Sequence, residues 1–273
     1  MRVSEQIIAK LKELKEDNSI ASYTHIKNIL KNQLIPIVYS EFKPFKLIRY
    51  RKHNKNQDFF ETSEELTYRK DILNINNFGR LNEPGQGYFY CNDNNNQSTG
   101  IDEIVSVFRG NEESKEETLT IGTWNVTRNL KLAVILPNDQ NIGINSEFDK
   151  LKEDYNNKFE DSEHFEDVKI LNEFIANEFT LDLEKHKSNY KITCAYSNYI
   201  KEQFPEIDGI IYASVKSEFS GTNIVLWQEA VDNKIQFFAA RKSIFKRVSD
   251  KKFVEVETFD SKSYDSKSDK IIW

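Results

Sequence analysis

The sequence has few of the residues that build disulfide, metal or secreted frameworks. Its 273 residues include two cysteines, Cys91 and Cys194, which form no CxxC pair, and four histidines without metal-ligand or triad spacing. Isolated cysteines are typical of a reducing compartment, so we expect neither a disulfide nor a bound metal. The histidine spacing also disfavours Ser–His nucleophilic chemistry.

Long apolar runs are lacking as well. The first residues, MRVSEQIIAKLKELKED, hold no apolar core of signal-peptide length, and no run approaches the ~20 residues needed to cross a bilayer. We therefore expect a cytoplasmic protein without a membrane partner. The net charge of −6, with acidic and basic residues mixed, also disfavours a nucleic-acid partner.

Helical periodicity is clearest near the start of the chain. Residues 4–16 and 19–33 each place apolar side chains on one face, which predicts a helical hairpin within residues 1–40. Such a pair usually packs on a domain flank or on a partner, so we expect an extension without a catalytic role. Residues 148–159, 168–175 and 190–203 show the same spacing and are interpreted as packing helices.

Strand-like runs dominate the rest of the chain. They lie at 45–50, 88–91, 119–136, 209–228 and 234–259. These runs predict one α/β (α+β) domain over residues 41–260, with a mixed, largely antiparallel sheet and flanking helices. We expect residues 119–136 and 234–259 each to form a hairpin, and the polar tail, 261–273, to fray.

The loop from Phe78 to Tyr90, FGRLNEPGQGYFY, combines a shaped backbone with polar side chains. Its three glycines and Pro84 favour a tight turn that leads into a strand. Arg80 brings a planar guanidinium suited to phosphate or carboxylate, and Asn82 brings both a donor and an acceptor. An ordinary β-turn with a solvated arginine explains the same residues.

Other polar candidates lie at element ends. Arg49 lies near the end of FKLIRY, Ser214 ends the strand GIIYAS, and Asn223 opens the next strand. Glu103 lies in GIDEIVSVFR, where we expect a helix from 100 to 109 and where the helix dipole alone would favour a carboxylate. Polar site residues often gather at strand ends that face a common loop.

Taken in order, FKLIRY, GRLNEPGQGYFY, GIDEI and DGIIYASVKSEFSGTNIVLW resemble the RES domain family, named for its arginine, glutamate and serine. The resemblance runs from about Phe45 to about Val248. It implies a compact fold similar to that of ADP-ribosylating toxins. It also implies an enzyme that consumes NAD and acts as a toxin paired with an antitoxin.

The family's functional residues have counterparts in this chain. The family's two arginines correspond to Arg49 and Arg80, and its strand tyrosine corresponds to Tyr90. Its glutamate, its serine and the asparagine after that serine correspond to Glu103, Ser214 and Asn223. The chain departs from the family at Leu81, where an aromatic residue is usual, and at Cys91, near which a serine is expected. The segment between Pro137 and Lys187 is also longer than in compact toxin members.

The resemblance implies that NAD is a substrate, and the cysteine and histidine pattern leads us to expect no metal. Arg49, Arg80 and Asn82 would hold NAD, with Tyr90 orienting nicotinamide. Glu103, Arg80 and Ser214 would form the catalytic set, with Glu103 stabilising positive charge on the ribose. Ser214 and Asn223 would position ribose, diphosphate or the nucleophile.

The nucleophile stays open at this point. Water would make the protein an NAD glycohydrolase, inorganic phosphate a phosphorylase, and a protein side chain an ADP-ribosyltransferase. A catalytically inactive RES-like module that binds a partner is the alternative from another class of protein. An antitoxin, another protein partner and a homodimer also remain open.

Overall fold

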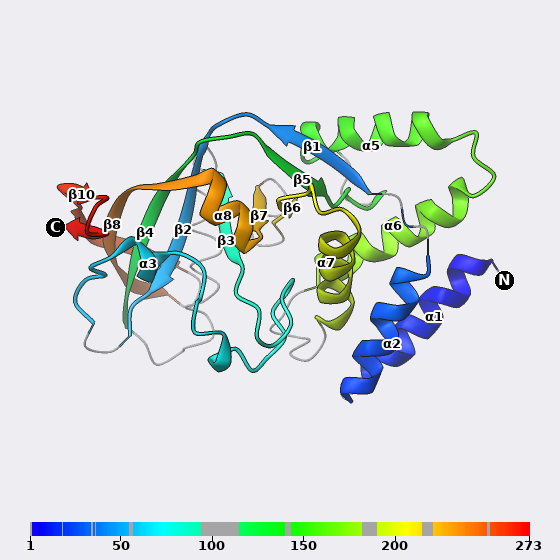
Figure 1. The fold of residues 1–273 in the computed structure, drawn as a ribbon, viewed down its shortest axis with the longest axis horizontal. Helices are drawn as coiled ribbons and strands as arrows, with labels where there is room; N and C mark the ends of the chain where they lie inside the picture. The colour runs from blue at the N-terminus through cyan, green and yellow to red at the C-terminus, as the bar shows by residue number, and fades with distance from the viewer. Residues whose placement is uncertain are drawn as a thin grey trace.

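The computed structural model of the chain describes residues 2–17, 19–33, 35, 37–54, 57–93, 115–139, 143–181, 190–214, 221–249 and 252–273 (Figure 1). Its helices are α1 (Val3–Glu16), α2 (Ile20–Lys31), α3 (Ser63–Leu66), η1 (Ile72–Asn74), α5 (Ser146–Phe159), α6 (Phe165–Phe179), α7 (Lys191–Gln203) and α8 (Gln228–Lys234). Its strands are β1 (Val38–Phe42), β2 (Lys46–Lys52), β3 (Phe89–Asp93), β4 (Glu116–Val126), β5 (Leu130–Val134), β6 (Gly209–Ala213), β7 (Thr222–Leu226), β8 (Ile235–Ser249), β9 (Lys252–Asp260), β10 (Ser263–Asp265) and β11 (Lys270–Ile272).

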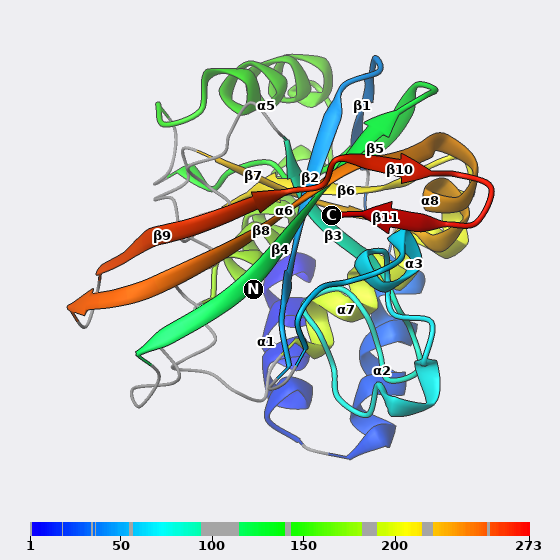
Figure 2. The same cartoon turned by 90° about the vertical axis from the view of Figure 1, so that its left-hand side faces the viewer.

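The main sheet confirms the predicted mixed, largely antiparallel architecture. Its strand order among the described residues is β1-β5-β6-β7-β3-β2-β4-β8-β9, and β5 and β6 form a parallel pair. The central strands β6 and β7 are rich in isoleucine, valine and leucine because both of their faces are covered. Figure 2 shows β4, β8 and β9 extending side by side away from this centre.

Two large apolar cores lie on opposite faces of the sheet. Alternation along the strands sends neighbouring residues to different cores, as with Ile210 and Ile211 on β6. The first core lies beneath α6 and α7 and also contains Leu11 and Ile26 of the N-terminal hairpin. The hairpin predicted at residues 1–40 is therefore present, and it shares its core with the sheet.

The prediction of a hairpin at residues 119–136 is wrong. The two strands form, but β4 lies between β2 and β8, whereas β5 lies between β1 and β6. Asp208, just before β6, holds β5 instead: its carboxylate accepts from Lys131 N at 2.8 Å and its own N–H donates to Lys131 O at 2.8 Å. This distant contact outweighs proximity along the chain. The hairpin predicted at 234–259 is confirmed as β8 and β9.

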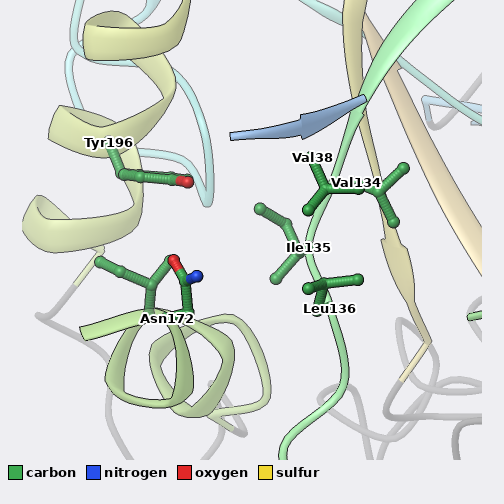
Figure 3. Close-up of a pocket in the computed structure, with 7 residues that line it drawn as sticks. Val38, Val134, Ile135, Leu136, Asn172 and Tyr196 are labelled. Atoms are coloured by element: carbon green, nitrogen blue, oxygen red, sulfur yellow. The ribbon is translucent and has the colours of Figure 1, made fainter. Parts of the chain in front are cut away.

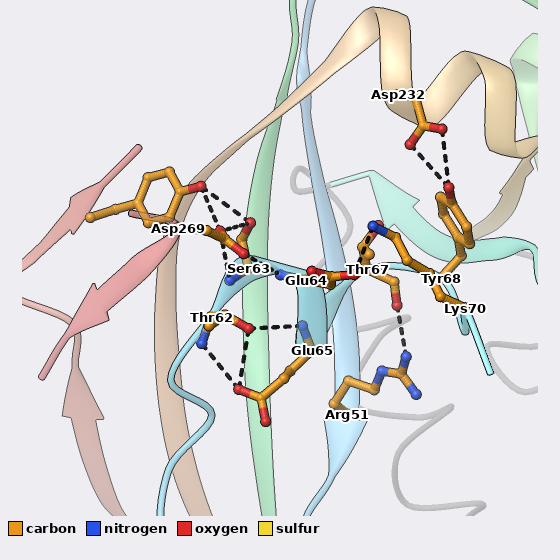
Figure 4. Close-up of polar contacts among 11 residues, drawn as sticks. Arg51, Thr62, Ser63, Glu64, Glu65, Thr67, Tyr68, Lys70, Asp232 and Asp269 are labelled. Carbon is orange, nitrogen blue, oxygen red and sulfur yellow. Dashed lines mark hydrogen bonds and ion pairs between the residues drawn. The ribbon is translucent and has the colours of Figure 1, made fainter. Parts of the chain in front are cut away.

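The prediction that the C-terminal tail frays is also wrong. Residues 263–272 form the β10–β11 hairpin, and Ile271 is buried in the second core. Trp273 Nε1 donates to Phe60 O at 2.8 Å. Asp269 accepts from Ser63 N at 3.1 Å at the start of α3, as Figure 4 shows. The tail's polar residues thus cap a helix, which its composition alone did not reveal.

Candidate functional site

The loop from Phe78 to Gln86, called the Arg80 loop below, enters β3 with a restricted backbone. Gly85 adopts a φ of 82°, in the left-handed region that favours glycine, and its N–H donates to Ile75 O at 2.9 Å. Gly79 N donates to Asn82 O at 2.9 Å and closes the turn that carries Arg80. The sequence therefore correctly predicted a tight turn here.

Arg80 is held by the helical layer. Its half-buried guanidinium donates to Phe179 O and, at 3.3 Å, to Leu181 O, where α6 ends. The guanidinium carbon lies 5.1 Å from the centre of the Tyr190 ring. Thr193 Oγ1 donates to Arg80 O at 2.5 Å. Because a cation is favoured at a helix C-terminus, part of this arginine's charge already stabilises α6.

Tyr90 fixes the loop from β3. Its hydroxyl accepts from Leu81 N at 3.1 Å and donates to Asn82 Oδ1 at 2.9 Å. Burial raises the pKa of Tyr90 well above its ordinary value, so the hydroxyl stays protonated and able to donate. The geometry therefore gives Tyr90 a structural role, since its hydroxyl positions Asn82.

A polar pair joins the central strands β3 and β7, two residues along β3 from Tyr90. Asn92 on β3 and Asn223 on β7 are paired across the strands, and Asn92 Nδ2 donates to Asn223 Oδ1 at 2.8 Å and to Thr222 O at 2.9 Å. Asn92 is only 5% exposed. Sequence reasoning missed it; the available signal was its place two residues after Tyr90, on the same face of the strand.

Most of the predicted residues share one face of the sheet. Tyr90 on β3 and Tyr212 on β6 both belong to the core beneath α7, and Asn223 is paired with Tyr212. Ser214 is fully buried one residue beyond β6, where it continues the alternation of Tyr212. On this face Tyr90 bonds Asn82, and the Arg80 guanidinium carbon lies 6.0 Å from the centre of the Tyr212 ring. Ser214 and Asn223 share the face by alternation and strand pairing.

Arg49 is not brought to this group. It follows Leu47 in the alternation of β2 and lies against Phe89 on the other face, with its guanidinium carbon 5.0 Å from that ring's centre. It is buried, and its Nη1 donates to Tyr90 O at 2.8 Å. Burial, followed by the nearby Arg51 charge, lowers the pKa of Arg49 to about 9. This arginine braces β3 from beneath the predicted site.

Glu103, the predicted charge-stabilising residue, and its helix lie outside the described residues. Within the part of the chain that the structure describes, no group of three or more His, Cys, Asp or Glu side chains could hold a metal ion. No helix in the same ranges has both the length and the apolar character to span a bilayer.

A polar pocket of about 640 Å³ opens elsewhere, at the far end of β2 and along residues 64–71. Several of its charged side chains have partners within the protein, as Figure 4 shows for part of it. Lys70 lies 2.9 Å from Glu64, Arg69 lies 2.6 Å from Asp71, and Arg51 donates to Thr67 O at 2.7 Å. Lys70 and Arg69 are thus paired with carboxylates, whereas Arg51 donates to a neutral carbonyl.

A second, small cavity lies between β5 and the helices α6 and α7 (Figure 3). Its volume is about 20 Å³, and Asn172 and Tyr196 approach it from the helices while Val134 and Leu136 approach it from the strand side. A space of this size holds about one water molecule and no organic substrate.

No protein-family model and no curated protein sequence matches this chain. The cluster around the Arg80 loop is the group that the sequence motifs and the geometry share.

Proposed function

We propose that the chain is an NAD-degrading enzyme of the RES type, with an ADP-ribosyltransferase-like fold, that cleaves the bond between nicotinamide and ribose. One observation carries the proposal. Residues from separate motifs lie at one face of the central strands: Tyr90 bonds Asn82 there, Arg80 lies over the Tyr212 ring, and Tyr212 is paired with Asn223. A chance similarity of short motifs would not require that convergence.

The chemistry of the group fits a dinucleotide. Arg80 has five N–H donors, and its two bonds to the end of α6 leave donors for a phosphate oxygen. Asn82, oriented by Tyr90, offers an amide N–H₂ for a ribose hydroxyl or a carboxamide. In this proposal Ser214 and Asn223 line the ribose side, while Arg49 supports β3 without touching substrate.

In the proposed reaction the bond between nicotinamide N1 and ribose C1′ breaks, and its electron pair leaves with neutral nicotinamide. Positive charge develops on the ribose, and the carboxylate of Glu103 stabilises it. A nucleophile then bonds to C1′. Water gives ADP-ribose and a released proton, inorganic phosphate gives a phosphorylated ADP-ribose, and a protein side chain becomes ADP-ribosylated.

A partner-binding module without activity is the second candidate. It is favoured by the engagement of Arg80 with the end of α6 and by the placement of Arg49 on the other face. Such a module would bind NAD weakly or not at all.

The test is to incubate purified protein with NAD, with and without inorganic phosphate, and to follow nicotinamide by chromatography. Calorimetric titration with NAD accompanies it. The enzyme releases nicotinamide, and dependence on phosphate identifies the nucleophile. Binding without release, or neither, favours the module.

A further inference from the structure

The N-terminal hairpin contacts the Arg80 loop directly. α2 lies against α7, and its Tyr23 is only 6% exposed. The Tyr23 ring meets the Phe78 ring edge-on, with centres 4.7 Å apart and planes at 61°. Phe78 is the first residue of the loop, so the loop's entry rests on α2.

The other end of the loop is tied to α2 through side chains. Asn198 on α7 donates to the Tyr23 hydroxyl at 3.1 Å and accepts from Gln86 Nε2 at 3.0 Å. Gln86 Nε2 also donates to Glu83 Oε1 at 3.2 Å. Lys27 Nζ, one helical turn after Tyr23, lies 3.7 Å from Glu83 Oε2. These contacts join α2 to both ends of the loop.

A second set of contacts connects α1 to the Arg80 guanidinium through α6. Lys15 and Glu178 form a buried ion pair at 2.7 Å between α1 and α6. Glu178 precedes Phe179, whose carbonyl accepts from Arg80. The hairpin thus holds the carbonyl that orients the guanidinium as well as the loop's two ends.

We propose that the N-terminal hairpin is part of the NAD site, with Tyr23 and Lys27 as positioning residues that hold the Arg80 loop in its binding geometry. This inference rests on the proposed function. Lys27 and Glu83 are partly exposed, with side chains 31% and 28% accessible. A change there should cost the fold little, so its effect on substrate binding can be separated from its effect on stability.

The test is a charge swap between α2 and the loop. Lys27→Glu places a carboxylate opposite both Glu83 and Glu202, each 3.7 Å from Lys27 Nζ, and Glu83→Lys places two ammonium groups together. We expect each to raise the KM and Kd for NAD about 5- to 10-fold at low salt, equivalent to about 1–1.4 kcal/mol, with kcat changed less than about twofold. The double variant restores an opposite-charge pair between positions 27 and 83 and should recover part of the affinity, since the carboxylate at position 27 still faces Glu202. Salt should shrink the effect of each single variant.

The matched control is Lys10→Glu, which reverses a lysine of the same hairpin in the exposed Lys10–Glu13 pair. It should leave KM unchanged. Unchanged NAD affinity in both Lys27→Glu and Glu83→Lys would overturn the proposal, as would a double variant no better than the single ones.

Hydrogen exchange without ligand separates this inference from the proposed function. The Gly79 amide is hydrogen-bonded within the loop and the Leu81 amide to the Tyr90 hydroxyl, and both should exchange faster in Lys27→Glu than in Lys10→Glu. Equal exchange in the two variants would refute positioning by Lys27. Faster exchange in a protein that never binds NAD would refute the proposed function and leave the hairpin as the support of the loop.

Discussion

Replacing Tyr90 with phenylalanine isolates the hydroxyl that holds the Arg80 loop. The ring remains, but Leu81 N and Asn82 Oδ1 lose their bonds at 3.1 and 2.9 Å. Leu81 is fully buried, so its amide is left without a partner. An unsatisfied buried amide costs about 1–3 kcal/mol, so we expect a loss of about 2 kcal/mol in the free energy of unfolding. In a chain of this size that lowers Tm by about 4–8 °C.

Tyr88 provides a matched control two residues earlier. Its hydroxyl is buried and has no hydrogen-bond partner among the described residues. Tyr88→Phe should therefore be neutral or slightly stabilising. Urea unfolding followed by tryptophan fluorescence compares the two variants. Equal stabilities for Tyr90→Phe and Tyr88→Phe would refute the assignment of Tyr90 as the support of the loop.

Two further predictions concern stability. Lys15→Met alone should lower the free energy of unfolding by about 3–5 kcal/mol, because it leaves Glu178 buried and unpaired. The double variant Lys15→Met/Glu178→Leu should lose less. Thermal melts in which the double variant has the lowest Tm would contradict this. Burial lowers the pKa of His53 below its ordinary value of 6.5. Just below pH 6.5 the unfolded state therefore binds more protons at this residue than the folded state does. The free energy of unfolding consequently falls as the pH falls through that range. Between pH 7.5 and 5.0, the urea midpoint should fall further for wild type than for His53→Gln, and equal falls would exclude His53.

Local sequence patterns predicted the individual elements well because apolar periodicity reports directly which side of an element is buried. The helices at 148–159, 168–175 and 190–203 appear as α5, α6 and α7, and the strand runs appear as strands. Strand partners were harder to predict. The pairing of β5 with β6 is accompanied by the bond from Lys131 to Asp208, 77 residues away, and no local rule contains that contact.

In the candidate site, too, local features could be predicted from the sequence and long-range contacts could not. The turn around Arg80 and the strand tyrosine Tyr90 follow from glycine and proline chemistry and from alternation. The direction in which Arg49 points could not be predicted, because a shift of one residue in alternation moves a side chain to the other face. Nor does composition reveal that α6 supplies carbonyl partners to Arg80 from 99 residues away.

The measurement that tests the central claim most directly is nicotinamide release from NAD by wild type and Glu103→Gln. If Glu103 stabilises charge on the ribose, the variant should lose about two to three decades in kcat, or ~3–4 kcal/mol, while its Kd for NAD changes little. Glu116→Gln, in the exposed pair with Lys246, is the control and should keep full activity. Release that survives in Glu103→Gln would contradict the mechanism, and no release from wild type would contradict the function.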